Sequence, residues 1–356
     1  MPPTDVTRRR FIAVSAALAA TAAWPHSGSA ATGLLEWRGI ALGAAASIRL
    51  AHPDRAKGRR LLQRCVDEIG RLERVFSLYL PDSDLCRLNR DGSLAAPPVE
   101  LVELLSYAAA VSAATDGAFD ATVQPLWLRY AEHFAAPDAD PAGPVLDDVL
   151  PQVDWRGVSL AADRIALARP GMSVTLNGIA QGYITDRVAE LLRADGMVSV
   201  LVDLGETRAL GSHPSGRPWQ IGLADAAAPS RIALHLDVRN AALATSGGYG
   251  TVFDPAGRHS HLIDPRSGRT APLRRSVSVL ASRAAVADAG STALALLPES
   301  DAPHLLRNLG ARSAFVQDDD GLRVLRGSTA PGRYRHMMQF NLQKAEFRDF
   351  PWRVER

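Results

Sequence analysis

The second half of the chain contains strand patterns separated by helical patterns, and the two do not alternate regularly. Alternating or continuously apolar stretches that predict strands cover residues 164–168, 198–204, 219–224, 231–238 and 276–281. Patterns with helical spacing interrupt them at residues 178–195, 284–297 and 302–310. Strands and helices without a βαβ rhythm favour an α+β fold over a doubly wound parallel sheet. We therefore expect mixed or antiparallel sheets with flanking helices.

The first half of the chain contains mainly helical patterns. Apolar residues at helical spacing predict an amphipathic helix over residues 55–76, after a short strand near residues 47–51. A second helix begins at Pro97-Pro98, where proline suits the first turn, and ends at Asp116-Gly117. The first half is therefore expected to be largely helical.

Composition indicates how the chain is divided. Residues 135–151 are rich in Ala, Pro and Asp, which predicts a loop. We expect one domain over residues 32–330, with this loop as a candidate internal boundary. Residues 331–356 then form a C-terminal extension.

The charges argue against a nucleic-acid-binding protein. The chain has 40 Lys and Arg and 38 Asp and Glu residues, a formal net charge of +2, without long blocks of one sign. We therefore expect no nucleic-acid partner. The fingerprint G-x-G-x-x-G of dinucleotide-binding folds, between a strand and a helix, is also missing from the sequence.

Two cysteines limit the covalent and metal chemistry of the chain. Cys65 and Cys86 are too few for a Cys-rich metal cluster. An oxidising compartment would allow one disulfide between them. Because Cys65 lies on the apolar stripe of the predicted helix, we expect it to pack there as a small hydrophobic residue.

The first 31 residues resemble a twin-arginine signal peptide. Arg8-Arg9-Arg10 precede an Ala-rich apolar run that ends at Trp24, and cleavage is expected near Ala30 or Ala31. The alternative is a membrane anchor, but about 14 apolar residues are too short to span roughly 30 Å of hydrocarbon. We therefore expect a protein exported in folded form to the periplasm, without stable membrane insertion.

Four segments differ from the hydrophobic pattern of a core. Two of them combine glycine with polar residues near the ends of predicted helices. Asp116-Gly117-Ala118-Phe119-Asp120 follows the second predicted helix, and Asp116-Gly117 alone is explained as a helix stop. In Asn177-Gly178-Ile179-Ala180-Gln181-Gly182-Tyr183, small residues open the helix predicted from residue 178. The N–H groups at such a helix start suit a phosphate, although a glycine-rich start alone does not establish a site.

The third segment places a histidine before a turn. Asp264-Pro265 followed by Ser267-Gly268 is typical turn sequence. If the preceding residues are extended, His261 shares a face with His259 and Ile263. From this segment alone, His261 is either a structural or surface histidine or a group that works in a site.

The fourth segment places two oxygen ligands on one helical face. Asp288 and Thr292 are four residues apart in the predicted helix over residues 284–297. Such oxygens suit Mg²⁺, and we expect Asp288 to be a partly solvated ligand. The alternative is an Asp stabilised by the helix dipole, with Thr292 bonding back into its own helix.

Together and in this order, the segments resemble the ApbE family of FAD:protein FMN transferases. The resemblance covers about residues 37–327, beginning with Phe76-Ser77-Leu78-Tyr79 and the stretch over residues 81–89. It continues through Gly117-Ala118-Phe119-Asp120, Gly178-Ile179-Ala180-Gln181-Gly182-Tyr183, Thr245-Ser246-Gly247, His261-Leu262-Ile263-Asp264-Pro265 and Asp288 with Thr292.

The resemblance implies a reaction in which FAD donates its FMN part to a Ser or Thr hydroxyl of an acceptor protein. AMP is released and Mg²⁺ assists. Such an attack on a pyrophosphate requires charge neutralisation at the phosphate oxygens and removal of the hydroxyl proton. His261 is the candidate general base, since histidine titrates near neutrality, and Asp288 is the second candidate catalytic residue through the metal.

The resemblance also implies the binding residues. For Mg²⁺ these are Asp288 and Thr292 with a backbone carbonyl near Gly178 or Ala180, and Ser291 stands where some members place a second metal carboxylate. The positions expected to line the FAD pocket are Leu42, Tyr79, Ala118, Phe119, Asp120, Thr175, Gln181 and Leu262 or Ile263.

Some positions depart from the family pattern. Gln181 stands where Lys or Glu is usual, Thr175 where Asp is common, and Gly205-Glu206-Thr207 replaces a frequent Gly-Gly-Asp. The twin-arginine signal, the opening Trp37-Arg38-Gly39-Ile40-Ala41-Leu42-Gly43 and the stretch Gly205-Glu206-Thr207-Arg208-Ala209-Leu210-Gly211 look most like the NosX-type branch. The resemblance implies that the acceptor is the NosR-type flavoprotein of nitrous oxide respiration. Two alternatives stay open: an FAD pyrophosphatase that uses water as acceptor, and a non-catalytic periplasmic flavin-binding or assembly protein.

Overall fold

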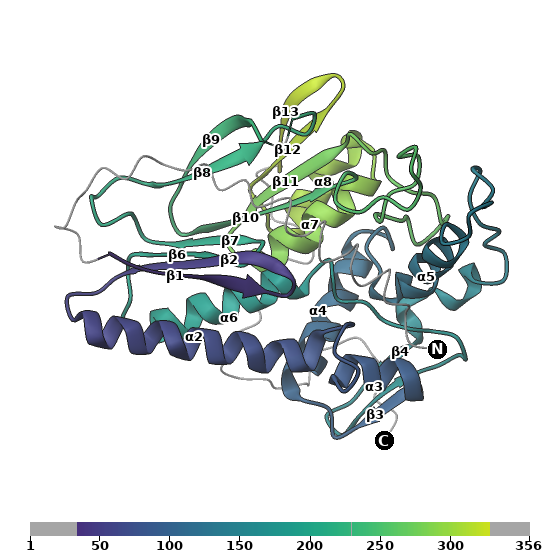
Figure 1. The fold of residues 1–356 in the computed structure, drawn as a ribbon, viewed down its shortest axis with the longest axis horizontal. Helices are drawn as coiled ribbons and strands as arrows, with labels where there is room; N and C mark the ends of the chain where they lie inside the picture. The colour runs from purple at the N-terminus through teal and green to yellow at the C-terminus, as the bar shows by residue number, and fades with distance from the viewer. Residues whose placement is uncertain (1–33, 229, 328–356) are drawn as a thin grey trace.

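The computed structural model describes residues 34–228 and 230–327 (Figure 1). The predicted signal peptide and the predicted C-terminal extension lie outside these residues. Among the helices in the described ranges, none combines the length and the apolar character needed to cross a bilayer.

Most strands belong to one antiparallel sheet with the order β1-β2-β6-β7-β10-β11-β12-β13. Its strands are β1 (Leu34–Ala41), β2 (Ala44–Ala51), β6 (Val200–Asp203), β7 (Thr207–Leu210), β10 (Ala241–Gly247), β11 (Ser276–Ala281), β12 (Ser313–Asp318) and β13 (Gly321–Arg326). A second sheet contains β3 (Ser93–Ala95), β5 (Arg164–Leu167) and β4 (Val158–Leu160), and a separate hairpin contains β8 (Trp219–Ala224) and β9 (Ile232–Val238).

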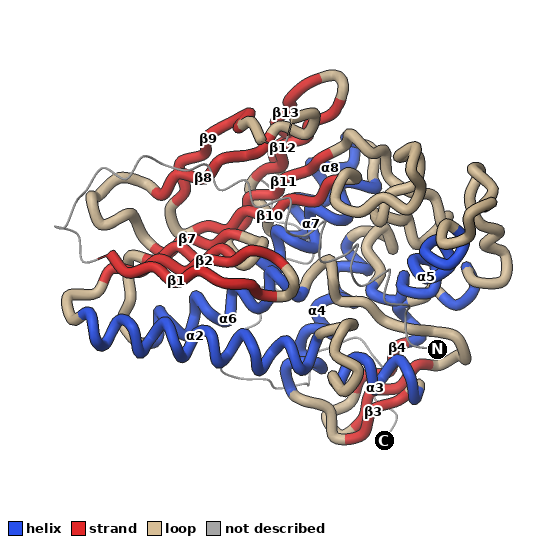
Figure 2. The backbone as a smooth tube through the Cα atoms, in the orientation of Figure 1, coloured by secondary structure: helices blue, strands red, loops and turns tan. Residues whose placement is uncertain are grey.

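Helices flank these sheets, so the predicted α+β fold with antiparallel sheets is confirmed (Figure 2). The α-helices are α2 (Arg55–Phe76), α3 (Asp84–Asp91), α4 (Val99–Ala114), α5 (Gln124–His133), α6 (Ala180–Ala194), α7 (Ala284–Leu296) and α8 (Ala302–Leu309). Short 3-10 helices are η1 (Ala121–Val123), η2 (Leu150–Gln152), η3 (Trp155–Gly157) and η4 (Glu299–Asp301). The first half also contains the β1–β2 hairpin, which the helical patterns there did not predict beyond one short strand.

Successive apolar side chains of strand β6 point to opposite faces of the large sheet, and both faces are buried there. Val200 and Val202 of β6 pack in the main core with the helices, whereas Leu201 packs against Trp219 of the β8–β9 hairpin. This alternation follows from the two-residue period of a strand. The helices therefore cover one face of the sheet, and the hairpin covers part of the other.

Helix α2 has the boundaries that the sequence predicts. The Asp54 side chain accepts hydrogen bonds from the N–H groups of Ala56 and Lys57, which caps the first turn. Cys65 is fully buried on the apolar stripe and both cysteines are free, so the expectation that Cys65 packs as a hydrophobic residue is confirmed. Burial raises the pKa of its thiol to about 12.

Helices α6 and α7 cross at a glycine. A Cβ atom on Gly182 would lie 2.5 Å from the main-chain oxygen of Ala284, so only glycine allows this approach. One turn further along α6, the buried Asp186 accepts hydrogen bonds from the N–H groups of Ala284 (2.8 Å) and Ala285 (3.2 Å). Asp186 also pairs with Arg208 and Arg283. The start of α7 is thereby held against α6.

We expect Gly182→Ala to lower the free energy of unfolding by about 1–3 kcal/mol, because the added methyl group cannot fit between the helices. Gly70→Ala in α2 is the matched control, since a Cβ there would meet only Arg74 Nη1, at 3.9 Å. That substitution should stabilise the protein by about 0.5–1 kcal/mol through helix propensity. Urea unfolding of both variants and the wild type measures the free energies. A Gly182→Ala variant as stable as the wild type would contradict the close crossing of α6 and α7.

Candidate functional site

The predicted metal residues converge where α7 meets the segment before α6. Asp288 and Thr292 lie on α7, as the sequence predicts. A Cβ atom on Gly178 would lie 3.1 Å from Thr292 Oγ1 and 3.3 Å from Phe119 Cε2. The structure therefore brings Gly178, Thr292 and Phe119 together, although they are far apart in the sequence.

Asp288 is buried, so the expectation of a partly solvated ligand is wrong. Its side chain is 3% exposed, because α6 packs directly over this turn of α7. The N–H of Gly182, in the first turn of α6, donates to Asp288 Oδ2 at 2.9 Å. Burial raises the pKa of Asp288 to about 7; the Gly182 N–H opposes this rise, and the charge of Asp186 adds to it.

The start of α6 is the helix start that suits a phosphate in the sequence. In the structure it donates one of its N–H groups to a carboxylate of the same chain. Gly182 supplies that N–H, and its partner Asp288 is the anion held at the positive end of α6. This contact fixes one carboxylate oxygen. The other oxygen, Oδ1, could hold a cation.

Hydroxyl groups surround Thr292. Ser246 Oγ of β10 lies 2.8 Å from Ser291 Oγ and 3.2 Å from Thr292 Oγ1. Ser291 Oγ donates to the main-chain oxygen of Asp288 at 2.9 Å. The bond back into the helix, which was the alternative for Thr292, is thus made by Ser291. Ser246 was not singled out from the sequence, although its motif Thr245-Ser246-Gly247 was.

Several residues predicted to line the FAD pocket lie beside this oxygen cluster. The side chain of Asn177, next to Gly178, forms a hydrogen bond with the Tyr79 hydroxyl. The N–H of Thr175 donates to the main-chain oxygen of Ala121 at 2.8 Å, which joins the segment before α6 to the loop that carries residues 118–120. Residues from three distant parts of the chain thus meet at one place.

Asp120 has a structural role in this loop. Its Oδ1 accepts hydrogen bonds from the N–H and the hydroxyl of Thr122, both at 2.7 Å. Its Oδ2 accepts one from the N–H of Trp155 at 3.0 Å. Burial raises the pKa of Asp120, which the bonds from Thr122 and Trp155 oppose. The residue fixes the loop that positions Ala118 and Phe119, both buried.

Gln181 lies under the β6–β7 turn. Gly205 in this turn has a positive φ of 97°, and a Cβ atom there would lie 2.7 Å from Gln181 Nε2. The N–H of Leu42, in the β1–β2 turn, donates to Glu73 of α2. Leu42 packs against the main core near the end of α2, from which the chain continues to Tyr79.

Leu262 and Ile263 are both buried, and they pack in different clusters. Leu262 belongs to the main core, whereas Ile263 packs with Leu126, Tyr130 and Val149. The side chain of Ile263 thereby ties the predicted turn to α5. Of the two residues, Leu262 is the one whose side chain joins the cluster that contains Phe119 and Ala180.

His261 lies over the loop that follows β10. It is not part of a regular strand: isolated bridges join Val252 to Ser260 and Ile263 to Thr270. Its Nδ1 lies where it can accept a hydrogen bond from the Thr251 N–H, at 3.1 Å, or donate one to the Thr251 carbonyl oxygen, at 3.2 Å. The Cε1–Nε2 edge of the ring lies against Gly250. Burial lowers the pKa of His261 below its usual value, so the ring is neutral at pH 7.

Glu206 is a buried carboxylate that the sequence analysis did not assign to the site. Its side chain accepts a hydrogen bond from the N–H of Thr245, the residue before Ser246. Burial, followed by the charges of Asp288 and Asp203, raises the pKa of Glu206 well above its usual value. The one signal for it in the sequence was the unusual Gly205-Glu206-Thr207.

The donor atoms at this place fit Mg²⁺. In the residues that the structure describes, no group of three or more His, Cys, Asp or Glu is arranged to hold a metal. The site instead offers the carboxylate of Asp288, the hydroxyl of Thr292 and main-chain carbonyls near Gly178. Mg²⁺ is bound through one or two carboxylates and completes its shell with water and substrate phosphates.

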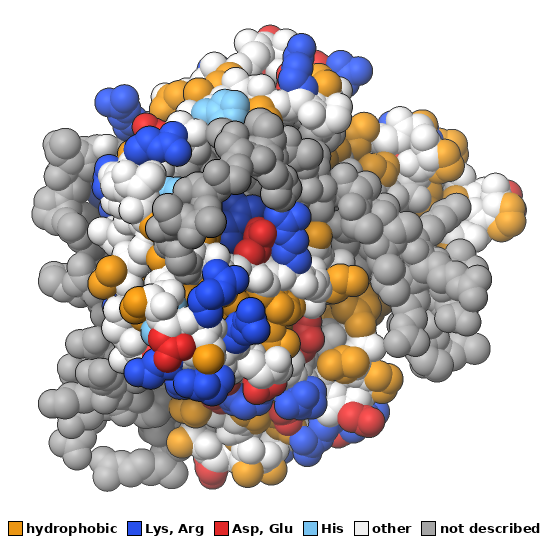
Figure 3. All heavy atoms as spheres, turned by 60° about the vertical axis from the view of Figure 1, so that its left-hand side comes forward, with side chains coloured by type: hydrophobic (Ala, Val, Ile, Leu, Met, Phe, Trp, Pro, Cys, Tyr) orange, Lys and Arg blue, Asp and Glu red, His pale blue; other side chains and the backbone are white. Residues whose placement is uncertain are grey.

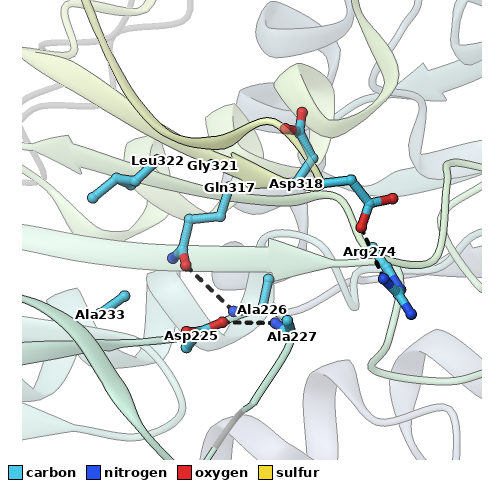
Figure 4. A pocket seen from close by; sticks show the side chains of 10 residues that line it. Asp225, Ala226, Ala227, Ala233, Arg274, Gln317, Asp318, Gly321 and Leu322 are labelled. Carbon is cyan, nitrogen blue, oxygen red and sulfur yellow. Dashed lines mark hydrogen bonds and ion pairs between the residues drawn. The ribbon is translucent and has the colours of Figure 1, made fainter.

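A separate depression lies between the ends of β8–β9 and β12–β13 (Figure 4). Its volume is about 140 Å³, below the roughly 300–1,000 Å³ of typical ligand sites. Gln317 bonds to Ala226 and Ala224, and Arg274 pairs with Asp319. These polar groups bond to one another, and none of the residues predicted to bind FAD or Mg²⁺ lines the depression.

Charges of both signs are interspersed on the described part of the face in Figure 3. Elsewhere in the described residues opposite charges also pair, as in Arg49–Glu36 at 2.8 Å and Arg64–Asp195 at 2.6 Å. The absence of a nucleic-acid partner stays a prediction.

Comparison with known proteins gives a consistent result. The model of the ApbE family matches residues 42–316. The FAD:protein FMN transferase of Treponema pallidum is 33% identical over 280 residues, which are 72% of this chain and 76% of that protein. The FAD:protein FMN transferase of Vibrio cholerae is 30% identical over 289 residues, which are 76% of this chain and 84% of that protein.

Solved structures share the fold. The flavin transferase ApbE from Vibrio cholerae has a TM-score of 0.70 at 24% identity, covering 83% of this chain and 98% of that one. The ApbE protein from Thermotoga maritima has a TM-score of 0.71 at 26% identity, covering 83% and 97%. The chain therefore belongs to the ApbE family and is a transferase.

Proposed function

We propose that this chain transfers FMN from FAD to a Ser or Thr hydroxyl of an exported acceptor protein, with Mg²⁺ held at Asp288 and Thr292. The observation that carries the proposal is the convergence of Asp288, Thr292, Gly178 and Phe119, which joins the predicted metal residues to the predicted flavin residues. The names of the relatives support the reaction class.

The reaction forms one phosphorus–oxygen bond and breaks another. The acceptor hydroxyl oxygen bonds to the phosphorus of the FMN part, and the pyrophosphate bond to AMP breaks. Mg²⁺, when bound, would neutralise charge on the phosphate oxygens. His261 would take the hydroxyl proton at Nε2 as the tautomer whose Nδ1–H donates to the Thr251 carbonyl, at 3.2 Å, in place of the tautomer whose Nδ1 accepts the Thr251 N–H. Asp288 would hold the ion, oriented by the Gly182 N–H.

A single experiment distinguishes transfer from the two other functions, an FAD pyrophosphatase and a flavin-binding or assembly protein. The purified chain is incubated with FAD and Mg²⁺, with and without a periplasmic extract as the source of acceptors. Covalently bound flavin on a protein, with release of AMP, supports transfer. Free FMN and AMP at the same rate without extract would support a pyrophosphatase, and unchanged FAD would support a flavin-binding or assembly protein.

We further propose export through the twin-arginine route and an acceptor of the NosR type, as in the NosX-type branch. The motif Arg8-Arg9 before an apolar run supports the export route, and the Gly205-Glu206-Thr207 sequence supports the branch. Deleting the gene in a nitrous-oxide-respiring host should remove covalent flavin from the NosR-type protein. A retained flavin would overturn this choice of acceptor.

The double substitution Arg8→Lys with Arg9→Lys should leave the protein in the cytoplasm, because the twin-arginine pair directs export. Fractionation of cells that express each form measures this. The Arg59→Lys, Arg60→Lys variant, which changes a pair within α2, is the control and should still be exported. Equal amounts of the Arg8–Arg9 variant and the wild type in the periplasm would contradict the proposed route.

A further inference from the structure

Glu206 lies in the short turn between β6 and β7, with its side chain directed into the protein. It is 7% exposed, and its carboxylate accepts a hydrogen bond from the N–H of Thr245 in β10. The next residue, Ser246, contacts Thr292 Oγ1 at 3.2 Å. The carboxylate of Glu206 therefore lies beside the hydroxyl cluster of the candidate metal site.

The same turn also packs on the first turn of α6. A Cβ atom on Gly205 would meet Gln181 Nε2 at 2.7 Å, and the residue after Gln181 is Gly182, which binds Asp288. The main-chain oxygen of Glu206 accepts a bond from Thr185 Oγ1, further along α6, at 3.3 Å. Glu206 and Asp288 thus both contact the first two turns of α6.

The charges of these two carboxylates are not balanced by basic side chains. In the part of the chain that the structure describes, neither Glu206 nor Asp288 forms an ion pair with Lys, Arg or His. Asp203, the third acid nearby, bonds to the N–H of Gly205 and is attracted to Arg49. Buried carboxylates without a basic partner are costly unless a cation or a proton accompanies them.

We propose that Glu206 is a second anionic group of the cation site at Asp288, and that its charge strengthens the binding of a divalent cation. The proposal rests on the proposed function, which places the ion at Asp288. In this role the charge of Glu206 lowers the dissociation constant of the ion. Its bond from Thr245 fixes the side chain in place for that role.

The test uses Mn²⁺ as the probe, with free Mn²⁺ measured by electron paramagnetic resonance during titration of the purified flavin-free chain. Glu206→Gln keeps an acceptor for the Thr245 N–H and removes only the charge. Its dissociation constant should rise by roughly 10–100-fold. Glu103→Gln is the matched control: it removes another half-buried carboxylate, bonded to Tyr183 at 2.7 Å, and should leave the affinity unchanged.

The possible outcomes separate this proposal from the proposed function. The expected rise in the dissociation constant is roughly 10–100-fold. A folded Glu206→Gln variant whose dissociation constant for Mn²⁺ stays within about twofold of the wild-type value would overturn the role of Glu206. Asp288→Asn with wild-type affinity would instead overturn the metal site itself. If Glu206→Gln is poorly folded, Glu206→Ala gives the same comparison, and the increase in Tm on adding Mn²⁺ should be smaller than in the wild type.

Discussion

Asp288→Asn is expected to lower the rate of FMN transfer by roughly a thousandfold or more, since several kcal/mol of charge stabilisation are lost and each ~1.4 kcal/mol is tenfold. The amide keeps an oxygen for the Gly182 N–H, so the crossing of α6 and α7 should persist. The substitution also removes a buried charge, and the metal-free variant should therefore unfold at no lower urea concentration than the wild type.

Single-turnover transfer at saturating FAD, over a range of Mg²⁺ concentrations, measures this effect. Glu103→Gln, which removes a carboxylate outside the oxygen cluster, should transfer at the wild-type rate. Wild-type transfer by Asp288→Asn at limiting Mg²⁺ would show that the ion is not held at Asp288.

His261→Ala is the second variant with a large expected effect. A general base contributes about 10²–10⁴-fold, so the chemical step should slow by that range. FAD affinity should change little, because binding comes mainly from the pocket and the metal site. Flavin fluorescence measures the affinity, and single-turnover transfer measures the step.

The pH dependence adds a check on the same residue. Because burial lowers the pKa of His261, the neutral, proton-accepting ring dominates at pH 7. With Mg²⁺ saturating, so that the ion keeps the Asp288 carboxylate ionised, the wild-type rate should fall when the pH drops below the usual histidine value of about 6.5. His259→Ala is the control: this ring packs on Tyr130 and Phe134, and its loss should lower stability without slowing the chemical step. A His261→Ala variant with the wild-type pH–rate profile would remove His261 from the mechanism.

Elements with strong local signals were predicted from the sequence. Helix α2 has an apolar stripe and the Asp54 cap, and its observed bounds agree with the predicted residues 55–76. Strands β8 and β11 also match the predicted residues 219–224 and 276–281, since their apolar alternation or run is clear. Local periodicity was sufficient wherever the element carried its own hydrophobic pattern.

Other features depend on contacts between distant segments. Strand β10 consists mainly of Ala, Ser, Thr and Gly, so its sequence has little strand character, and pairing with β7 and β11 defines it. The burial of Asp288 could not be predicted because it arises from the crossing at Gly182. For the same reason Glu206, contributed by a turn between short strands, was not recognised beside Asp288.

Transfer of FMN to an exported protein is tested most directly in cells that lack the chain. Exported proteins from the deletion strain are compared with those from strains that carry the wild type or Asp288→Asn, by in-gel flavin fluorescence and peptide mass spectrometry. We predict that only the wild type restores a peptide whose Ser or Thr carries the mass of one FMN less one water. The same flavinylated peptide in all three strains would contradict the account.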